Sequence, residues 1–151
     1  MRIVCDTSIA ISGILWSGIP NQILKLGERG VLDICGTFET MAEFERVIKY
    51  EKFDKRIKEL NLSVSTITDF YIDLTVLFEA KQIEKIIVKE DPDDDIFLEA
   101  ALGSNSHFIV SGDEHLLKLE KYKDIFILSA KEFLDFCNIS SLETDTDKRG
   151  L

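Results

Sequence analysis

The stretch HFIVSGD, residues 107–113, joins a short apolar run to a turn that ends in an acid. Its apolar residues are contiguous rather than alternating, which is typical of a strand buried on both faces in a parallel sheet. Four other stretches have the same character: RIVCD (2–6), VLDICG (31–36), EKIIVKE (84–90) and DIFILSA (124–130). The sequence therefore predicts a mainly parallel sheet of about five strands.

Helical patterns separate these apolar runs. The predicted helices span residues 20–28, 37–52, 54–60, 65–80, 93–104, 114–120 and 131–137. Strands that alternate with helices predict right-handed crossovers and an α/β fold, a three-layer α/β/α sandwich with a Rossmann-like central sheet. A chain of 151 residues is long enough for one domain, which we expect to span residues 1–139. The polar tail, residues 140–151, is expected to be flexible.

The composition indicates a soluble globular protein, with 45% hydrophobic and 30% charged residues. The sequence contains no apolar run long enough for a membrane span and does not start like a signal peptide, so we expect a cytoplasmic protein. Cys5, Cys35 and Cys137 stand far apart and are expected to be thiols in a reducing compartment. Two histidines and no CxxC motif argue against a zinc site.

The formal net charge of −10 argues mildly against a protein that holds a polyanion through bulk charge. It does not exclude nucleic acid, because carboxylates that hold a divalent metal ion present positive charge to a phosphate. Basic residues cluster at 49–58 and 118–123, where solvated helix faces of mixed charge are the favoured interpretation.

Acids follow three of the predicted strands. Asp6 ends the first strand, Asp113 follows the fourth, and the run 91–95 follows the third. Ligands of open α/β sheets bind beyond the carboxyl ends of the strands, so these acids are expected at one edge of the sheet. In a chain without zinc-type ligands, this pattern indicates a site for Mg²⁺ or Mn²⁺, which prefer oxygen ligands.

Helix capping is the alternative interpretation of the same acids. Aspartate after a strand is a favoured N-cap, so Asp6 and Asp113 could each simply begin a helix. For either motif alone, capping is the better interpretation. Taken together, the acids at equivalent topological positions favour the metal site.

The run EDPDDD, residues 90–95, can be divided by helix geometry. Pro92 suits the first helical position, which makes Asp91 the expected N-cap, while Asp93 and Asp95 add negative charge to the first turn. At 100° per residue, Asp94 lies above the apolar stripe, whereas Asp95 is rotated away from it. We therefore expect Asp94 to be the metal ligand and Asp95 to support it.

Four stretches together resemble the PIN domain family, in the branch of PIN-family toxins of VapBC-like toxin–antitoxin systems. They are VCDTSIAISGIL (4–15), FETMAEFERVIKYEKF (38–53), DPDDDIFLEAAL (91–102) and HFIVSGDEHLL (107–117). The resemblance covers about residues 1–138 in order and spacing. It implies a Rossmann-like α/β/α domain with metal-dependent ribonuclease activity.

The resemblance also implies which residues carry the chemistry. Asp6, Glu43, Asp94 and Asp113 correspond to the acidic constellation of the family. Asp6, Asp94 and Asp113 would bind one or two Mg²⁺ or Mn²⁺ ions, and Glu43 would ligate the ion or orient the attacking water. Ser8 and Ser111 correspond to supporting hydroxyl residues, although this branch often has asparagine at the position of Ser8.

The implied substrate is RNA, cleaved to 5′-phosphate and 3′-hydroxyl ends. A small antitoxin protein is the expected partner, and the helical pair at 54–80 is a candidate surface for a homodimer.

Two other enzyme classes fit less well. Ser129 and Lys131 could serve as the hydroxyl and the lysine of a receiver domain, but this sequence has no phosphoacceptor aspartate at the end of the third predicted strand. A haloacid-dehalogenase-type phosphatase would need an aspartate at the position of Ser8. A PIN-like domain that acts mainly as a binding partner remains the non-enzymatic alternative.

Overall fold

The computed structural model describes residues 1–84, 86–90 and 92–138. The elements, in chain order, are β1 (Arg2–Cys5), α1 (Thr7–Leu15), α2 (Ile19–Glu28), β2 (Asp33–Gly36), α3 (Phe38–Val47), η1 (Glu51–Phe53), α4 (Asp54–Glu59), α5 (Val64–Leu74), β3 (Val76–Leu77), η2 (Pro92–Asp94), α6 (Asp95–Ser104), β4 (Phe108–Val110), α7 (Glu114–Leu117), β5 (Lys121–Tyr122) and β6 (Ile125–Leu128). Residues 130–138 form a further helix. The polar tail at 140–151 and the proposed N-cap Asp91 lie outside the described residues.

The strands form one sheet in the order β3-β2-β1-β4-β6-β5. Every pair is parallel except β5 with β6, which is antiparallel. The five parallel strands confirm the predicted mainly parallel sheet. The two-residue strand β5 adds an edge that the apolar pattern does not predict, because its residues Lys121 and Tyr122 are not a buried apolar run.

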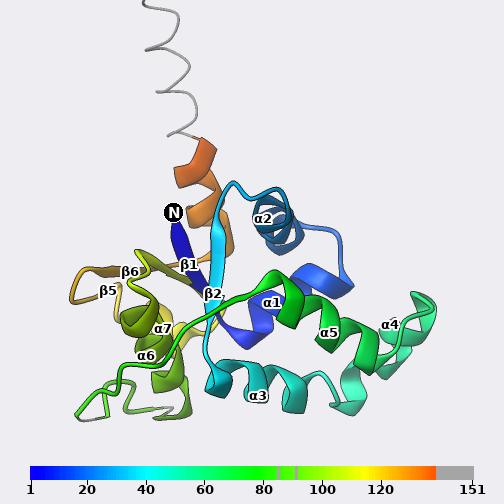
Figure 1. The fold of residues 1–151 in the computed structure, drawn as a ribbon, viewed down its shortest axis with the longest axis horizontal. Helices are drawn as coiled ribbons and strands as arrows, with labels where there is room; N and C mark the ends of the chain where they lie inside the picture. The colour runs from blue at the N-terminus through cyan, green and yellow to red at the C-terminus, as the bar shows by residue number, and fades with distance from the viewer. Residues whose placement is uncertain (85, 91, 139–151) are drawn as a thin grey trace, which may run out of the picture.

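Helices cover both faces of the sheet (Figure 1). Successive side chains of a strand point to opposite faces, so Ile3 and Cys5 of β1 join one apolar cluster while Val4 joins another. The first cluster packs against α1, α2, α3 and α5, and the second against α6 and α7. This arrangement confirms the predicted three-layer α/β/α sandwich.

The strand predicted at 84–90 is wrong, because the described residues 86–90 form no strand. The backbone amides of Ile87 and Val88 donate instead to the carboxylate of Asp95, at 2.9 and 2.7 Å. Only part of this apolar run is buried: Val88 is 1% exposed, whereas Ile86 is 57% exposed. A side chain therefore takes the donors that a neighbouring strand would have used.

The third strand is Val76–Leu77, which lies within the helix predicted at 65–80, so that prediction is wrong there. Helix α5 ends at Leu74, and Thr75 takes an extended conformation with φ −87° and ψ 134°. The Thr75 hydroxyl donates to the Tyr71 carbonyl at 2.7 Å, which satisfies one acceptor at the end of this helix. The chain then pairs with β2 through Val76 and Cys35.

Two other predicted helices end well before their predicted last residue. The helix predicted at 37–52 divides into α3 and η1. The helix predicted at 114–120 stops at Leu117, and the chain reverses through Glu120, whose φ is +57°. Among the described residues, no helix combines the length and apolar character that a membrane crossing requires.

We expect the three cysteines to differ in their reactivity. Cys5 and Cys35 are 3% and 1% exposed, whereas Cys137 is partly exposed. Burial raises the pKa of all three thiols, so each has less of the reactive thiolate than an exposed cysteine. Under native conditions a thiol reagent should label Cys137 first, and Cys5 and Cys35 should react only after unfolding. A second rapidly labelled thiol in a Cys137→Ser variant would contradict this expectation.

Candidate active site at the carboxyl edge of the sheet

The candidate site lies where the strand order changes direction. The chain builds the sheet outward from β1 through β2 to β3 and then returns to place β4 on the other side of β1. Ligands of open α/β sheets bind at such a switch point, beyond the carboxyl ends of the strands. Asp6 follows β1 directly, and Ser111 to Asp113 follow β4, so both segments meet at this point.

Asp6 is the centre of this site and is only 4% exposed. Its Oδ1 accepts hydrogen bonds from the Ile9 amide at 2.8 Å and the Ser8 hydroxyl at 3.0 Å. Its Oδ2 accepts from the Ser111 hydroxyl at 2.5 Å and the Gly112 amide at 3.1 Å. Burial raises the pKa of Asp6, and the four hydrogen bonds partly offset that increase.

Ser111 connects Asp6 to the second acid of the site. Its hydroxyl donates to Asp6 and accepts the backbone N–H of Asp113 at 2.9 Å. Asp113 then begins α7, because its Oδ1 accepts the His115 amide at 2.7 Å and the Leu116 amide at 3.4 Å. The structure therefore brings Asp6, Ser8, Ser111 and Asp113 together.

Capping and site formation involve the same aspartates. Asp6 caps α1 and Asp113 caps α7, as the capping interpretation predicts. The capping hydrogen bonds are made to Oδ1 of each aspartate and hold its carboxylate in place. Both carboxylates still lie at the edge of the sheet. The cap explains the local sequence, whereas the contact of Ser111 with Asp6, 105 residues away in the chain, explains why the two caps lie together.

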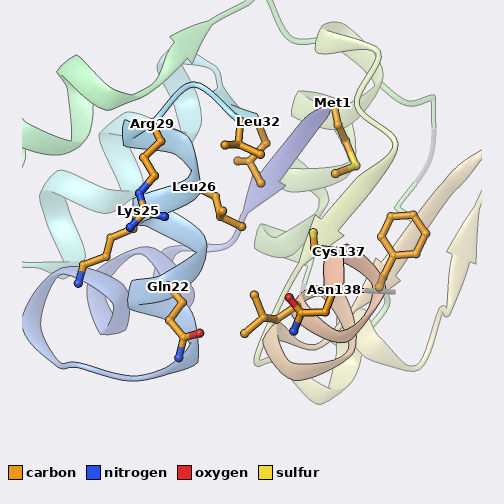
Figure 2. A pocket seen from close by; sticks show the side chains of 11 residues that line it. Met1, Gln22, Lys25, Leu26, Arg29, Leu32, Cys137 and Asn138 are labelled. Atoms are coloured by element: carbon orange, nitrogen blue, oxygen red, sulfur yellow. The ribbon is translucent and has the colours of Figure 1, made fainter. Parts of the chain in front are cut away.

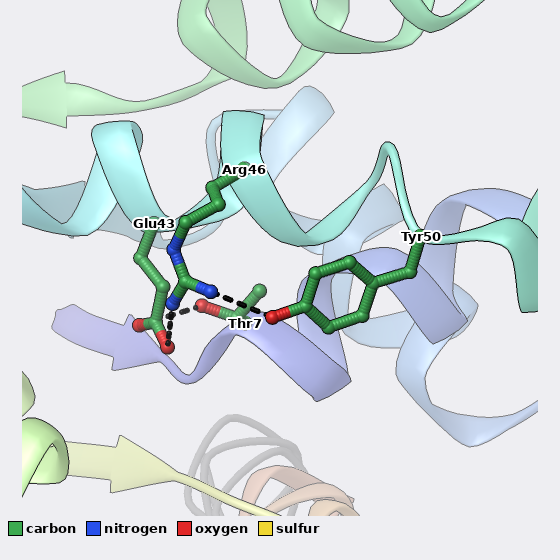
Figure 3. Close-up of polar contacts among 4 residues, drawn as sticks. All are labelled: Thr7, Glu43, Arg46 and Tyr50. Carbon is green, nitrogen blue, oxygen red and sulfur yellow. Dashed lines mark hydrogen bonds and ion pairs between the residues drawn. The ribbon is translucent and has the colours of Figure 1, made fainter.

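Glu43 approaches the site from α3. Its Oε2 accepts a hydrogen bond from the Thr7 hydroxyl at 3.1 Å, and Thr7 directly follows Asp6 (Figure 3). On the other side, Arg46 Nη2 lies 3.8 Å from Glu43 Oε1, and Arg46 Nη1 donates to the Tyr50 hydroxyl at 2.6 Å. Thr7, Arg46 and Tyr50 were not among the residues predicted from the sequence. The spacing of Glu43, Arg46 and Tyr50 by three and four residues was the available signal.

Asp94 and Asp95 are both buried, at 8% and 7% exposure. Asp94 ends η2 and immediately precedes α6. Asp95 was expected to be rotated toward Glu99, and burial together with the nearby Asp95 charge raises the pKa of Glu99. The Asp95 carboxylate also accepts the Ile87 and Val88 amides.

The donor chemistry of the site fits a hard divalent cation. Buried Asp6 is bonded to two hydroxyls and two amides, all neutral donors, and these leave a carboxylate whose charge a cation would stabilise. The spacing of the acids fits a metal ion less well than their chemistry does. In the described part of the chain, no three or more His, Cys, Asp or Glu side chains lie close enough together to hold a metal ion. The oxygen ligands are therefore of the right kind but are not gathered into one three-carboxylate group.

The residues that suggested a receiver domain have other roles. The Ser129 hydroxyl accepts the Glu132 amide at 3.2 Å, while Glu132 Oε1 accepts the Ser129 amide at 3.1 Å. This reciprocal pair is a capping box for the helix at 130–138. Lys131 lies 3.9 Å from Asp135. A receiver of the flavodoxin-like type also has the parallel strand order 2-1-3-4-5, whereas here the order begins β3-β2-β1-β4.

Comparison with protein-family models matches residues 2–115 to the model described as PIN domain. The matched segment contains every candidate acid of the site and the two strands that immediately precede Asp6 and Ser111. Comparisons with curated proteins and with solved structures gave no match.

Proposed function

This chain belongs to the PIN domain family, whose members are generally nucleases, and from that premise we propose that it is a divalent-metal-dependent endoribonuclease. The observation that supports this most is the contact between Asp6 and the Ser111–Asp113 segment at the switch point of the sheet. It places acidic oxygen donors where open α/β sheets bind ligands.

The proposed roles are those that the family resemblance implies for each residue. Asp6, Asp94 and Asp113 would hold Mg²⁺ or Mn²⁺, which supplies positive charge for the phosphodiester and makes an attacking water more acidic. Ser8 and Ser111 orient the Asp6 carboxylate through their hydroxyls. Glu43, which accepts the Thr7 hydroxyl, would ligate the ion or orient the water that attacks the phosphorus.

Metal removal tests this proposal. We expect a labelled single-stranded RNA to be cleaved with Mg²⁺ or Mn²⁺ and left intact with EDTA, while a DNA of matched sequence is left intact in both cases. Independently of activity, a metal concentration about 100 times its Kd should stabilise the folded protein by roughly 2.7 kcal/mol. Cleavage in EDTA, or the absence of any metal-dependent change in melting temperature, would contradict the proposal.

A binding role without strong nuclease activity is the second candidate. It is favoured by the absence, among the described residues, of a group of three acids close enough to hold a metal ion. If RNA bound to the protein but stayed intact with both metals, this second function would replace the first.

We also propose a toxin role, with a small antitoxin as partner and a homodimer surface at residues 54–80. Buried carboxylates at the site would favour a basic residue from the antitoxin. Expression in bacteria should arrest growth, and the arrest should be lost with Asp6→Asn. Growth arrest that persists in that variant would separate toxicity from this site.

A further inference from the structure

Positive charge is concentrated in one segment of an otherwise acidic chain. Residues 46–58 contain six Lys or Arg and two acids, a net charge of +4, in a chain whose net charge is −10. The segment runs from the last turn of α3 through η1 to α4. It begins three residues after Glu43, so it leads directly away from the candidate site.

Aromatic rings alternate with the basic side chains of this segment. The Arg46 guanidinium lies 6.0 Å from the centre of the Tyr50 ring, and Lys52 Nζ lies 5.1 Å from that of Phe53. Phe53 is 6.5 Å from the Trp16 ring, over which Arg56 lies at 5.9 Å. The basic–aromatic strip is defined by these residues: Arg46, Tyr50, Lys52, Phe53, Trp16 and Arg56.

Two rings of the strip are accessible. Trp16 is 43% exposed and Tyr50 is 42% exposed. The Arg46 side chain is 60% exposed, and a guanidinium has five N–H donors, of which the Tyr50 hydroxyl takes one. The strip therefore offers aromatic faces and cationic donors to the same ligand.

The strip is held in place by bonds to the elements around the site. Arg56 Nε donates to the Leu15 carbonyl at 2.7 Å, which fixes α4 against the end of α1. At the other end, Arg46 lies between Tyr50 and Glu43, whose carboxylate binds Thr7 beside Asp6 (Figure 3). A ligand that leaves the acids along α3 would meet Arg46 and Tyr50 first.

We propose that the basic–aromatic strip binds single-stranded RNA next to the cleaved bond. Arg46, Lys52 and Arg56 contact phosphates, while bases stack on Tyr50 and Trp16. Aromatic stacking combined with a positive groove is how proteins hold single strands without reading their sequence. This assignment of the substrate surface rests on the proposed ribonuclease function, but the binding itself can be measured without cleavage.

Trp16 reports directly on this binding because it is the only tryptophan of the chain. In EDTA, where the RNA is not expected to be cleaved, titration with a single-stranded RNA of about 12 nucleotides should quench its fluorescence in a saturable way; oligonucleotide-binding folds cover about 4–16 nucleotides. The affinity should fall as salt rises, because phosphate contacts release counterions. An RNA duplex of the same sequence should quench less, since its bases are already stacked.

Substitutions locate the surface. Tyr50→Ala should weaken binding at least about fivefold, and Tyr50→Phe, which keeps the ring, should bind like the wild type. Lys52→Ala should also weaken binding and lower the salt dependence. The matched controls, Lys25→Ala and Phe136→Ala, should leave the affinity unchanged.

These control residues belong to a separate cavity of about 550 Å³ near Met1, at the amino end of β1 (Figure 2). It contains none of the candidate acids. Melting temperatures within a few degrees of the wild type would show that each variant is folded.

The outcomes separate this proposal from the ribonuclease function. Asp6→Asn should lose cleavage and keep the quenching. If wild-type protein cleaves RNA but Trp16 is not quenched, or if Lys25→Ala weakens binding as much as Lys52→Ala, the strip is not the RNA surface. If Trp16 is quenched and no metal supports cleavage, the strip stands and the ribonuclease function fails.

Discussion

Asp6→Asn should reduce RNA cleavage at least about a hundredfold while the protein remains folded. The amide keeps the size of the side chain and an oxygen that can accept the Ile9 amide, so the cap of α1 survives. It removes the negative charge that would hold the cation. In the wild type the second oxygen of Asp6 accepts from Ser111 and Gly112. In the variant an NH₂ group would face these two donors instead.

The stability of this variant should depend on pH differently from that of the wild type. Burial raises the pKa of Asp6 in the folded state above its ordinary value, so the charged form costs free energy when no cation is bound. The wild type gains stability from this group below the unfolded-state pKa and loses it as the pH rises through the folded-state pKa. The melting temperature of metal-free Asp6→Asn, relative to wild type, should therefore increase from acid to neutral pH.

Asp33→Asn is a matched control, because Asp33 is an exposed aspartate at the start of the neighbouring strand β2. It should leave cleavage, metal response and stability near their wild-type values. Ser111→Ala should give an intermediate loss of cleavage, since it removes one bond to Asp6 and the acceptor of the Asp113 amide. Full activity in a folded Asp6→Asn preparation, measured by RNA cleavage with Mn²⁺, would refute the assignment of Asp6.

The fold could be predicted where the apolar pattern and the topology agree. Continuous apolar runs identify the central strands that contain Val4 and Ile109, because both faces of the sheet are covered. Because Asp6 and Asp113 follow two of these strands, the topology also predicts that both acids lie at one edge of the sheet. It failed at Ile87 and Val88, where the run is apolar but a carboxylate takes its amides.

The rest of the site depends on contacts that no local pattern encodes. In the sequence Thr7 is only the first residue of a helix. Its contact with Glu43 joins residues 36 positions apart, and no local pattern indicates it. Glu43 itself could not be chosen by helix periodicity, since Glu39 and Glu45 lie on the same helix, and the family resemblance selected it. The two-residue strand Val76–Leu77 carries too few residues for a period to be visible.

Asp95→Ala should lower the free energy of unfolding by about 2–4 kcal/mol, the second large effect we expect. The carboxylate accepts two backbone amides, and the variant leaves the buried Val88 amide without this acceptor. Val88 and Phe97 belong to the same apolar cluster, so release of the 86–88 segment also loosens the core beneath it. Asp95→Asn, which keeps a single acceptor oxygen, should lose about half as much stability.

Its neighbours provide the controls, because three consecutive aspartates should behave differently. Asp93 is exposed, and Asp93→Ala should cost about 0.3–1 kcal/mol through lost charge in the first turn. Asp94→Asn should abolish cleavage with little change in stability if Asp94 is the metal ligand. Urea unfolding and RNA cleavage measured on all three variants decide between the roles. If Asp94→Asn is as unstable as Asp95→Ala, or if Asp95→Ala is stable and inactive, then the division of this acidic run into one metal ligand and one structural acceptor is wrong.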